Sequence, residues 1–376
     1  MLPRHHAKLD LSLFPGKVLV IFGSRQVGKT TLIKNYLAST LLRSRFESGE
    51  NILIHETLGS RDFPRLKAFA QGLELLVIDE AQRVPDIGLA LKILVDECPE
   101  LRILVSGSSS FELAGQIGEP LTGRKKTITL YPESLLELAT ESSPYELSLR
   151  IPEFLVYGMY PAVLTEAAVE GKREVLRELV GSYLLRDVLE LERVKASRTL
   201  LSLLRLLAWQ VGSEVSHNEL GQKLGLDGKT VARWLDLLEK AFVLFSLGGY
   251  SGNLRNEVKR KNKYYFYDVG IRNTLIANLN PLELRDDQGA LWENFIMLER
   301  LKSRSYLGID ANPFFWRTWE GKEIDLVEER GGKLWTYEFK WNPGKAAILP
   351  KVFAEAYPGS PFEVVHRDNW AAFLLG

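Results

Sequence analysis

A glycine-rich segment near the N-terminus contains the residue types that bind a polyphosphate. Residues 23–30 read GSRQVGKT and stand between an apolar run, Val18 to Phe22, and a stretch with helical character. Gly23 and Gly28 let backbone N–H groups face a phosphate, Lys29 supplies a positive charge for the β- and γ-phosphates, and the Thr30 hydroxyl suits magnesium. The order of strand, loop and helix argues against a chance match in a turn. The predicted nucleotide-binding residues are Gly23, Ser24, Arg25, Gln26, Val27, Gly28, Lys29, Thr30 and Thr31.

Two further apolar runs end in polar side chains. Leu75 to Ile78 has the continuous apolar character of a parallel strand buried on both faces, and Asp79 and Glu80 follow it. We expect Asp79 to hold magnesium and Glu80 to act as the general base for the attacking water. The run that ends at Val105 is followed by Ser106, whose hydroxyl can bond that water or the γ-phosphate. A strand that merely ends in solvated carboxylates is the alternative for Asp79 and Glu80, and the preceding phosphate loop disfavours it.

These segments also carry a family resemblance. GSRQVGKTTL, LLVIDEAQRVPD, ILVSGSSS and LTGRKKTITLYP, in this order, resemble the ATPase core of a group of bacterial and archaeal AAA+ ATPases that lies near the signalling (STAND-type) P-loop ATPases. The resemblance implies that Ser106 is the sensor 1 residue, with Ser108 as the second choice. It also implies ATP as the ligand, since the sequence has no recognisable guanine-specificity motif.

The resemblance assigns roles to two further residues. Arg124 precedes an alternating apolar stretch, where AAA+ proteins often place an arginine finger that acts on the nucleotide of a neighbouring subunit. The alternative for Arg124 is a surface arginine in a basic run. Pro161, in the sequence Gly-Met-Tyr-Pro, resembles an element that packs near the adenine in these relatives, and a structural turn between helices is equally compatible with it.

Composition favours a soluble, cytoplasmic protein of several domains. The chain has 376 residues and 45% hydrophobic residues, enough for two or three cores, and a single cysteine, which excludes a disulfide framework. It has neither an apolar run of membrane-spanning length nor the apolar core of a signal peptide at its N-terminus, so we expect no membrane partner. Lys plus Arg equals Asp plus Glu at 48 each, so any nucleic-acid surface must be local.

The chain is expected to form four parts. Strands and helices alternate from about 17 to 132, which predicts an α/β fold with a parallel P-loop sheet. The next stretch is rich in Leu and Glu at helical spacing, typical of the helical lid that follows an AAA+ core. The predicted divisions are an AAA+ core at 1–135, a helical lid at 136–205, a winged helix at 206–275 and a restriction-endonuclease-like (PD-(D/E)xK) α/β domain at 276–376.

The winged-helix prediction comes from residues 213–247. A turn at residues 225–228 separates two helical patterns, and the second places Val231, Trp234, Leu235 and Leu238 on one apolar stripe. Its other face carries the side chains expected to meet DNA. Two strands, 243–249 and 263–267, are expected to flank a basic connector. The predicted DNA-binding residues are Lys229, Thr230, Arg233, Arg255, Lys259 and Arg260, and the connector also contains Lys261 and Lys263. Winged helices also serve as protein-docking or spacer modules.

The last hundred residues contain a second group of carboxylates. Residues 316–318, 323–327 and 336–340 are typical of three short strands between two helices, an order that resembles the PD-(D/E)xK nuclease fold. The resemblance implies magnesium ligands at Asp325 and Glu338, a water-positioning lysine at Lys340, and Glu293 as a possible third carboxylate. Ile324 replaces the proline of the signature. An inactive nuclease-like fold or a salt-bridged strand face remains an alternative. The tryptophans, Trp335 and Trp341 included, are interpreted as core or sheet-covering residues, and stacking on bases is the disfavoured alternative.

The combined expectation is an ATP- and magnesium-dependent AAA+ ATPase that engages DNA through its C-terminal modules. Because an arginine finger acts across a subunit boundary, a nucleotide-dependent homo-oligomer is expected. DNA processing, repair or defence is the natural process, and nuclease activity is left open. The alternative from another class is a STAND-like signalling switch that binds a protein partner and retains an inactive nuclease-like fold.

Overall fold

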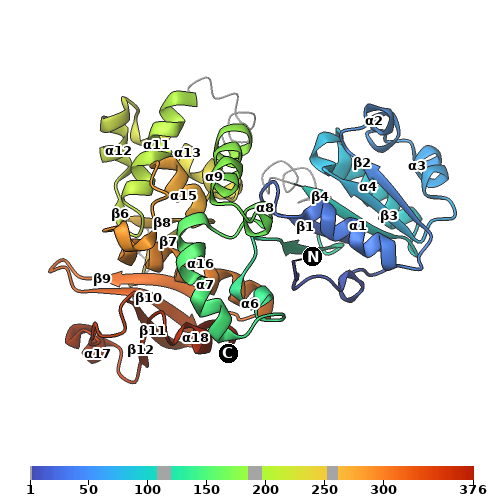
Figure 1. Cartoon of the computed structure of the whole chain (residues 1–376). Coiled ribbons are helices and arrows are strands. Elements are labelled where there is room, and N and C mark those ends of the chain that lie inside the picture. Colours follow the sequence, from blue (N-terminus) through green and yellow to red (C-terminus); the bar gives the residue numbers. More distant parts are fainter. Residues whose placement is uncertain (1, 108–119, 185–196, 252–260) are drawn as a thin grey trace. The chain divides into compact units, whose positions relative to one another are not determined.

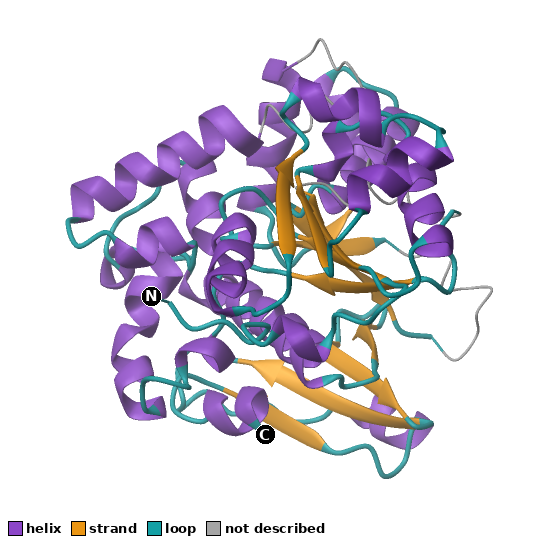
Figure 2. Ribbon diagram, turned by 90° about the vertical axis from the view of Figure 1, so that its right-hand side faces the viewer, coloured by secondary structure: helices purple, strands orange, loops and turns teal. Residues whose placement is uncertain are grey.

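The computed structural model describes residues 2–107, 120–184, 197–251 and 261–376. The chain separates into two compact units. The N-terminal unit contains Pro3–Tyr131 together with Lys240–Phe242, and the C-terminal unit contains Pro132–Glu239 together with Val243–Gly376. Figure 1 labels their elements, and Figure 2 distinguishes helices from strands. The predicted Ser108, Arg255, Lys259 and Arg260 lie outside the described residues.

The N-terminal unit is built on parallel strands. Its sheet has the order β2-β3-β4-β1-β5, and every described pairing in it is parallel. This confirms the predicted α/β arrangement with a parallel sheet. The elements are η1 (Leu9–Leu11), β1 (Val18–Phe22), α1 (Lys29–Ser39), β2 (Ser44–Ser48), α2 (Ile52–Leu58), α3 (Phe63–Ala70), β3 (Leu75–Asp79), η2 (Ala81–Arg83), α4 (Ile87–Glu97), β4 (Arg102–Gly107) and β5 (Lys125–Thr129).

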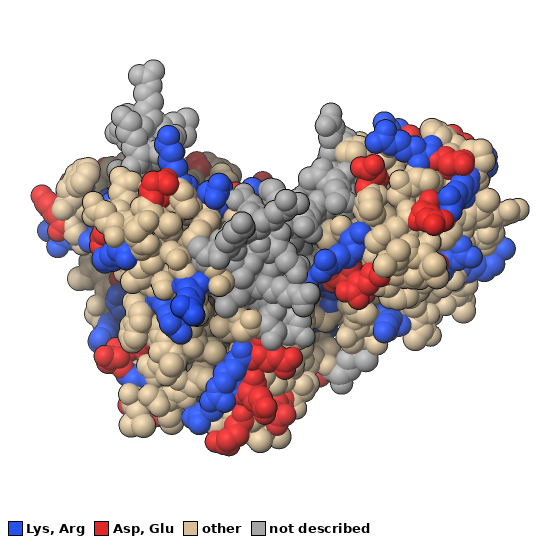
Figure 3. Space-filling view, turned by 90° about the horizontal axis from the view of Figure 1, so that it is seen from above, with Lys and Arg blue, Asp and Glu red and all other residues tan. Residues whose placement is uncertain are grey.

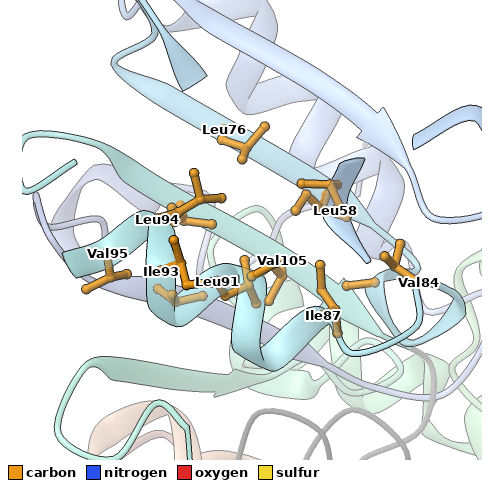
Figure 4. Packing of buried hydrophobic residues seen from close by; sticks show 14 of the residues in the cluster. Leu58, Leu76, Val84, Ile87, Leu91, Ile93, Leu94, Val95 and Val105 are labelled. Atoms are coloured by element: carbon orange, nitrogen blue, oxygen red, sulfur yellow. The ribbon is translucent and has the colours of Figure 1, made fainter. Parts of the chain in front are cut away.

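The core of this unit fixes the strand ends. Every residue of β1 and of β3 is buried, as continuous apolar runs in a parallel sheet require. Figure 4 shows one face of that core, where Leu91 and Leu94 of α4 pack with Leu76 and Val105 of the strands. Because the strands are parallel, the residues that follow β1, β3 and β4 emerge at the same end of the sheet.

The C-terminal unit contains both helices and strands. Its helices are α6 (Leu135–Leu138), α7 (Pro144–Tyr157), α8 (Pro161–Thr165), α9 (Val169–Glu178), η3 (Leu179–Leu184), α11 (Ser197–Trp209), α12 (His217–Leu224), α13 (Gly228–Lys240), α15 (Val269–Leu275), η4 (Leu282–Leu284), α16 (Gln288–Leu307), α17 (Lys351–Ala356) and α18 (Trp370–Leu375). Its strands are β6 (Glu214–Val215), β7 (Leu244–Gly249), β8 (Asn262–Phe266), β9 (Asn312–Arg317), β10 (Glu323–Arg330), β11 (Lys333–Phe339) and β12 (Phe362–Val365).

One continuous sheet crosses the predicted division at residue 275. Its order is β12-β11-β10-β9-β7-β8-β6, so the strands after the helix-turn-helix and those of the last hundred residues share hydrogen bonds. The junction is the parallel pair β7–β9, in which Gly248 lies opposite Phe314 and Gly249 opposite Phe315. The two predicted C-terminal modules are therefore joined through their backbones.

The helices expected to form a lid bond to the C-terminal unit. The Asn273 side chain on α15 donates to the carbonyl oxygens of Leu155 (2.9 Å) and Val156 (2.8 Å), near the end of α7. Lys302 on α16 donates to the carbonyl oxygen of Glu133 at 2.7 Å. These bonds fix the segment that follows residue 132 to α15 and α16, and its role as a lid over a nucleotide stays a prediction.

Candidate functional site

The glycine-rich loop is held ready for an anion. Gly23 has φ of 157°, and a Cβ atom there would collide with the carbonyl oxygen of Leu130. Gly28, with φ of 95° in the left-handed region, is the N-cap of α1. Lys29 is buried, and its Nζ donates to the carbonyl oxygens of Gly23 (2.8 Å) and Ser24 (2.9 Å). The lysine charge and the N–H groups that begin α1 thus meet in one turn, as phosphate binding requires.

Three predicted site residues, Thr30, Asp79 and Ser106, form one hydrogen-bonded group. Thr30 Oγ1 donates to Asp79 Oδ2 at 2.7 Å, and Ser106 Oγ donates to Asp79 Oδ1. Asp79 and Ser106 are both buried, at the ends of the neighbouring strands β3 and β4. Oxygen ligands of this kind suit Mg²⁺, so the Thr30 hydroxyl and the Asp79 carboxylate fit the cation predicted for them.

Glu80 is positioned by its backbone and by a neighbouring amide. It adopts the left-handed conformation (φ 51°), and its backbone N–H donates to Ser106 Oγ at 3.3 Å. Gln82 Nε2 donates to Glu80 Oε2 at 2.6 Å. The structure therefore brings together Lys29, Thr30, Asp79, Glu80 and Ser106, and it adds Gln82, which the sequence reasoning missed.

Arg4 is a second residue that the sequence reasoning missed. Its guanidinium donates to the carbonyl oxygen of Tyr131 (3.0 Å) and to that of Val27 within the loop. Two residues further on, burial lowers the pKa of His6 to about 4, with His5, Lys126 and Arg4 adding to the effect. The N-terminal segment therefore secures the phosphate loop, a long-range contact for which the sequence offers no motif.

The remaining predicted residues of the ATPase site have other surroundings. Arg124 is partly exposed and pairs with Asp96 at 2.9 Å, so its role as an arginine finger stays a prediction. The turn before Pro161 is fixed by Asp268, which accepts a hydrogen bond from the Met159 N–H at 2.7 Å. Burial raises the pKa of Asp268 to about 6, against the opposing effect of its backbone hydrogen bonds. The contacts at this turn are those of a structural turn within the C-terminal unit.

An acidic cavity in the C-terminal unit, named for Asp286, Glu293 and Asp325, is lined by part of the second group of predicted residues, and Glu338 is not among its lining residues. Its volume is about 320 Å³. The lining residues are Asp286, Gln288, Gly289, Glu293, Asp325, Phe339, Lys340, Trp341, Asn342 and Lys345. Asp325 and Lys340 thus line the same cavity, together with Glu293 from α16.

Asp325 is buried at an irregular point of the sheet. The pairing register between β9 and β10 shifts between Ile324 and Val327, and such bulges redirect side chains near active sites. Asp325 Oδ2 accepts a hydrogen bond from the Phe339 N–H at 2.7 Å. Burial raises the pKa of Asp325 well above its usual value, and the nearby Glu293 and Glu338 add to this effect.

Two residues of β8 bind the third carboxylate. Tyr265 Oη donates to Glu293 Oε1 at 2.8 Å, and Lys263 Nζ lies 3.5 Å from the same oxygen while also pairing with Glu323. Burial opposes the charged form of Lys263, but Glu293, Glu323 and Asp325 together raise its pKa. The expectation that Lys263 belongs to an exposed basic connector is wrong, because its side chain is 1% exposed and faces carboxylates.

Glu338 and Lys340 pair with each other. Lys340 Nζ lies 2.6 Å from Glu338 Oε1, and the pKa of Lys340 is raised because Glu338, Asp325 and Glu293 outweigh its partial burial. In the described part of the chain, no group of three or more His, Cys, Asp or Glu side chains has the arrangement of a metal site. Magnesium binding by Asp325 and Glu338 therefore stays a prediction, and the carboxylates are balanced by Lys263 and Lys340.

The helix-turn-helix prediction corresponds to α12 and α13. Val231, Trp234, Leu235 and Leu238 are buried on α13, as expected from their spacing. Lys229 and Arg233 are exposed, and Thr230 bonds the capping Asp227 through its N–H (2.8 Å) and its hydroxyl (2.7 Å). On the face drawn in Figure 3, basic and acidic side chains are interspersed among the described residues.

Comparisons with known proteins divide the chain into three segments. Residues 15–139 match an AAA domain, residues 149–283 match a domain of unknown function (DUF8612), and residues 288–369 match another (DUF4143). The uncharacterized protein Rv2008c of Mycobacterium tuberculosis is 30% identical over 339 residues, which cover 89% of this chain and 72% of that protein. The chain belongs to the family of this mycobacterial protein.

The family extends beyond mycobacteria. An uncharacterized protein of Haemophilus influenzae is 26% identical over 342 residues, which cover 84% of this chain and 80% of that protein. The uncharacterized protein MJ1544 of Methanocaldococcus jannaschii is 22% identical over 341 residues, which cover 85% of this chain and 74% of that protein. Among solved structures, protein VC1899 from Vibrio cholerae aligns with a TM-score of 0.15 and 10% identity, covering 94% of this chain and 95% of that one, a similarity too low to bear on the fold.

The family segments divide the candidate sites unevenly. The AAA domain includes the phosphate loop, Asp79, Glu80, Ser106 and Arg124, and its match supports nucleotide binding at that loop. The lining of the acidic cavity belongs to the DUF4143 segment except for Asp286, whereas Lys263 and Tyr265, which contact Glu293, belong to the DUF8612 segment. Within the described residues, no helix of this family member is long and apolar enough to cross a membrane.

Proposed function

We propose that the chain binds ATP with Mg²⁺ in its N-terminal unit and hydrolyses it. The observation that carries this proposal is the group in which Thr30 and Ser106 both donate to Asp79, one from the phosphate loop and the other from a neighbouring strand end. Bound MgATP supplies the phosphoanhydride bond and the cation that neutralises its charge. The match to an AAA domain supports the same conclusion.

The residues of this site have distinct tasks. Lys29 and the N–H groups at the start of α1 bind phosphate oxygens, and Thr30 and Asp79 supply oxygen ligands. Glu80 accepts a proton from the attacking water, and Gln82 fixes its carboxylate through the 2.6 Å hydrogen bond. Ser106 orients Asp79 and the Glu80 backbone together. Each task follows from a contact within the N-terminal unit.

Binding and hydrolysis are tested separately. Lys29→Ala is expected to abolish binding of a fluorescent ATP analogue, whereas Lys34→Ala, an exposed lysine on the same helix, should leave it unchanged. Tight analogue binding by Lys29→Ala would contradict the assignment of the phosphate loop.

We further propose that the active form is a homo-oligomer in which Arg124 serves a neighbouring subunit. Exposure of Arg124 and its position before β5 support this, and its pair with Asp96 is a surface interaction that a closer partner can replace. Mixing is the test: Arg124→Ala and Lys29→Ala subunits should both be inactive alone and regain turnover together. Failure of the mixture while Arg124→Ala alone retains full turnover would contradict the proposal.

The third part of the proposal is that the C-terminal unit engages DNA, in DNA processing, repair or defence. The exposed Lys229 and Arg233 on α13, the helix-turn-helix order of α12 and α13, and the following hairpin β7–β8 are compatible with a winged helix. The order α16, β9, β10, β11, α17 is compatible with the PD-(D/E)xK interpretation of Asp325, Glu338 and Lys340. Cleavage of DNA at that site is not required for engagement.

DNA binding is tested at low salt with duplex and single-stranded oligonucleotides. Binding should weaken as salt rises, and replacing Lys229 and Arg233 by alanine should reduce both the affinity and the salt slope. Lys223→Ala, on the exposed face of α12, is the matched control. A wild-type chain that binds no DNA would contradict this part and favour a signalling switch with a protein partner.

A further inference from the structure

Several chemically distinct features lie at one end of the seven-stranded sheet. Because β7 and β9 are parallel and β10 is antiparallel to both β9 and β11, the carboxyl ends of β7, β9 and β11 lie at the same end of the sheet as the start of β10. Asp325, Phe339 and the adjoining Lys340 of the acidic cavity are therefore at this end. The turn that joins β9 to β10 projects from the same end, and Figure 1 shows it extending beyond the end of β9.

This β9–β10 turn, Thr318–Lys322, is closed by hydrogen bonds. The Thr318 N–H donates to the Lys322 carbonyl oxygen (2.9 Å), and the Gly321 N–H donates to the Thr318 carbonyl oxygen (3.0 Å). The Lys322 N–H also donates to Thr318 Oγ1 at 3.1 Å, and Gly321 supplies the left-handed conformation (φ 82°). The turn thus has a defined backbone conformation.

The tip of this turn carries a fully exposed tryptophan. Trp319 has a relative exposure of 106%, whereas Trp292 and Trp370 are buried. The partly exposed Trp335 is covered by Arg330, 5.2 Å from its ring centroid, and Trp341 packs on Trp292. Trp319 therefore departs from the expectation that the tryptophans are core or sheet-covering residues. An indole offers a large flat apolar surface on which a planar ligand can stack.

The surroundings of Trp319 favour a flat ligand that carries negative charge. Lys322 is exposed on the same turn, and Arg317 at its base is 41% exposed, where it is shared by Glu214 and Glu323. Lys340 and Lys345 line the cavity at the same end of the sheet. Trp319 lies two residues after Arg317 in the chain, and Asp325 lies two residues after Glu323, the residue that pairs with Arg317.

We propose that Trp319 is a stacking platform for unpaired bases of a nucleic acid whose backbone continues toward the acidic cavity. This inference rests on the proposed engagement of DNA and specifies its form as single strands or the unpaired arms of a fork. Every base has a face that can stack on an indole, so such contacts tolerate any sequence. Lys322 and Lys345 supply the charge that phosphates require.

The test measures affinity for three oligodeoxynucleotides of equal length by fluorescence anisotropy: a single strand, a blunt duplex and a fork with unpaired arms. Trp319→Ala should weaken binding of the single strand and the fork between about 5-fold and 100-fold and change duplex binding less than about 2-fold. Trp319→Phe should recover part of the loss. Trp209→Ala removes another exposed tryptophan, at the end of α11, and should leave all three affinities unchanged.

The outcomes separate this inference from the function on which it rests. If the wild-type chain binds no DNA, both the proposed engagement and this inference are wrong. If it binds DNA and Trp319→Ala binds all three probes as the wild type does, only the stacking role is wrong. An equal loss on all three probes, or a changed oligomeric state without a change in DNA affinity, would also contradict stacking and assign the turn to another contact.

Discussion

The two candidate sites treat their central aspartate in opposite ways. Asp79 is buried and receives hydrogen bonds from two hydroxyl groups, Thr30 and Ser106. Asp325 is equally buried beside other carboxylates, and burial raises its pKa well above the usual value. In the N-terminal unit neutral hydroxyl donors surround the carboxylate that we propose binds the cation, whereas in the C-terminal unit the carboxylates are balanced by lysines already in place.

The two sites also differ in what their buried lysines contact. Lys29 donates to two backbone carbonyl oxygens of the phosphate loop, where we propose that its charge meets an anionic ligand. Lys263 is surrounded by Glu293 and Glu323, so its charge is used within the protein. The first arrangement is that of a ligand site. The second links β8 to α16 and β10.

The largest effect is expected from removing the buried lysine. Lys263→Met should destabilise the C-terminal unit by about 3–5 kcal/mol, because Glu293 and Glu323 lose their buried partner. All eight tryptophans lie in this unit, so urea unfolding followed by tryptophan fluorescence reports on it alone. Lys333→Met, at an exposed position of β11, is the control. A change below about 1 kcal/mol for Lys263→Met would show that the carboxylates do not depend on this lysine.

The next effect is a pH dependence confined to the C-terminal unit. Burial raises the pKa of Asp268 from 3.8 to about 6, so the folded state holds a proton that the unfolded state has lost between these values. The contribution is fully present below pH 3.8 and is lost as pH rises to about 6, which amounts to about 3 kcal/mol. Asp268→Asn should flatten this part of the profile of unfolding free energy against pH. An unchanged slope would contradict the assignment to Asp268.

A smaller effect is expected at the strand end next to Asp79. Ser106→Ala removes one donor to Asp79 and the acceptor of the Glu80 N–H, so ATP turnover should fall about 10- to 100-fold while ATP affinity changes little. Ser39→Ala, on α1 and away from the strand ends, is the control. Steady-state phosphate release over a range of ATP concentrations separates the two quantities. A loss in KM alone would mean that Ser106 serves binding and not hydrolysis.

The smallest effect is expected from the N-terminal segment. Arg4→Ala removes two hydrogen bonds that support the loop, so KM for ATP should rise about 5-fold, equivalent to about 1 kcal/mol, with kcat nearly unchanged. Arg4→Lys should retain part of the effect, and the neighbouring His5→Ala should have none. Equal KM values for Arg4→Ala and the wild type would show that Arg4 does not contribute to the nucleotide site formed by the sequence motif.

The sequence predicted what is local and missed what is distant. The phosphate loop, Asp79 and Ser106 follow apolar runs that show where strands end, and parallel strands bring those ends together. The contact of Arg4 with Val27 joins a short basic segment to the phosphate loop, and no periodic pattern in the sequence indicates this contact. Lys263 was misassigned because a lysine beside a basic stretch resembles a solvated one until Glu293 and Glu323 are brought to it by α16 and β10.

The joined sheet of the C-terminal unit is another example. Gly248 and Gly249 pair with Phe314 and Phe315, more than sixty residues away in the chain, and neither segment indicates its partner. The strands β9, β10 and β11 were predicted as short strands, and the apolar stripe of α13 was predicted from its helical spacing. Exposure of Trp319 depends on the five-residue turn Thr318–Lys322, whose hydrogen bonds become visible only in three dimensions.

The central claim is that the N-terminal unit hydrolyses ATP with Glu80 as the base, and phosphate release by wild-type and Glu80→Gln chains tests it most directly. The account predicts magnesium-dependent release by the wild type that DNA stimulates. It predicts release at least about 100-fold slower from Glu80→Gln, with ATP still bound. Phosphate release by Glu80→Gln at the wild-type rate, or a wild-type chain that binds ATP with magnesium and releases no phosphate with or without DNA, would contradict it.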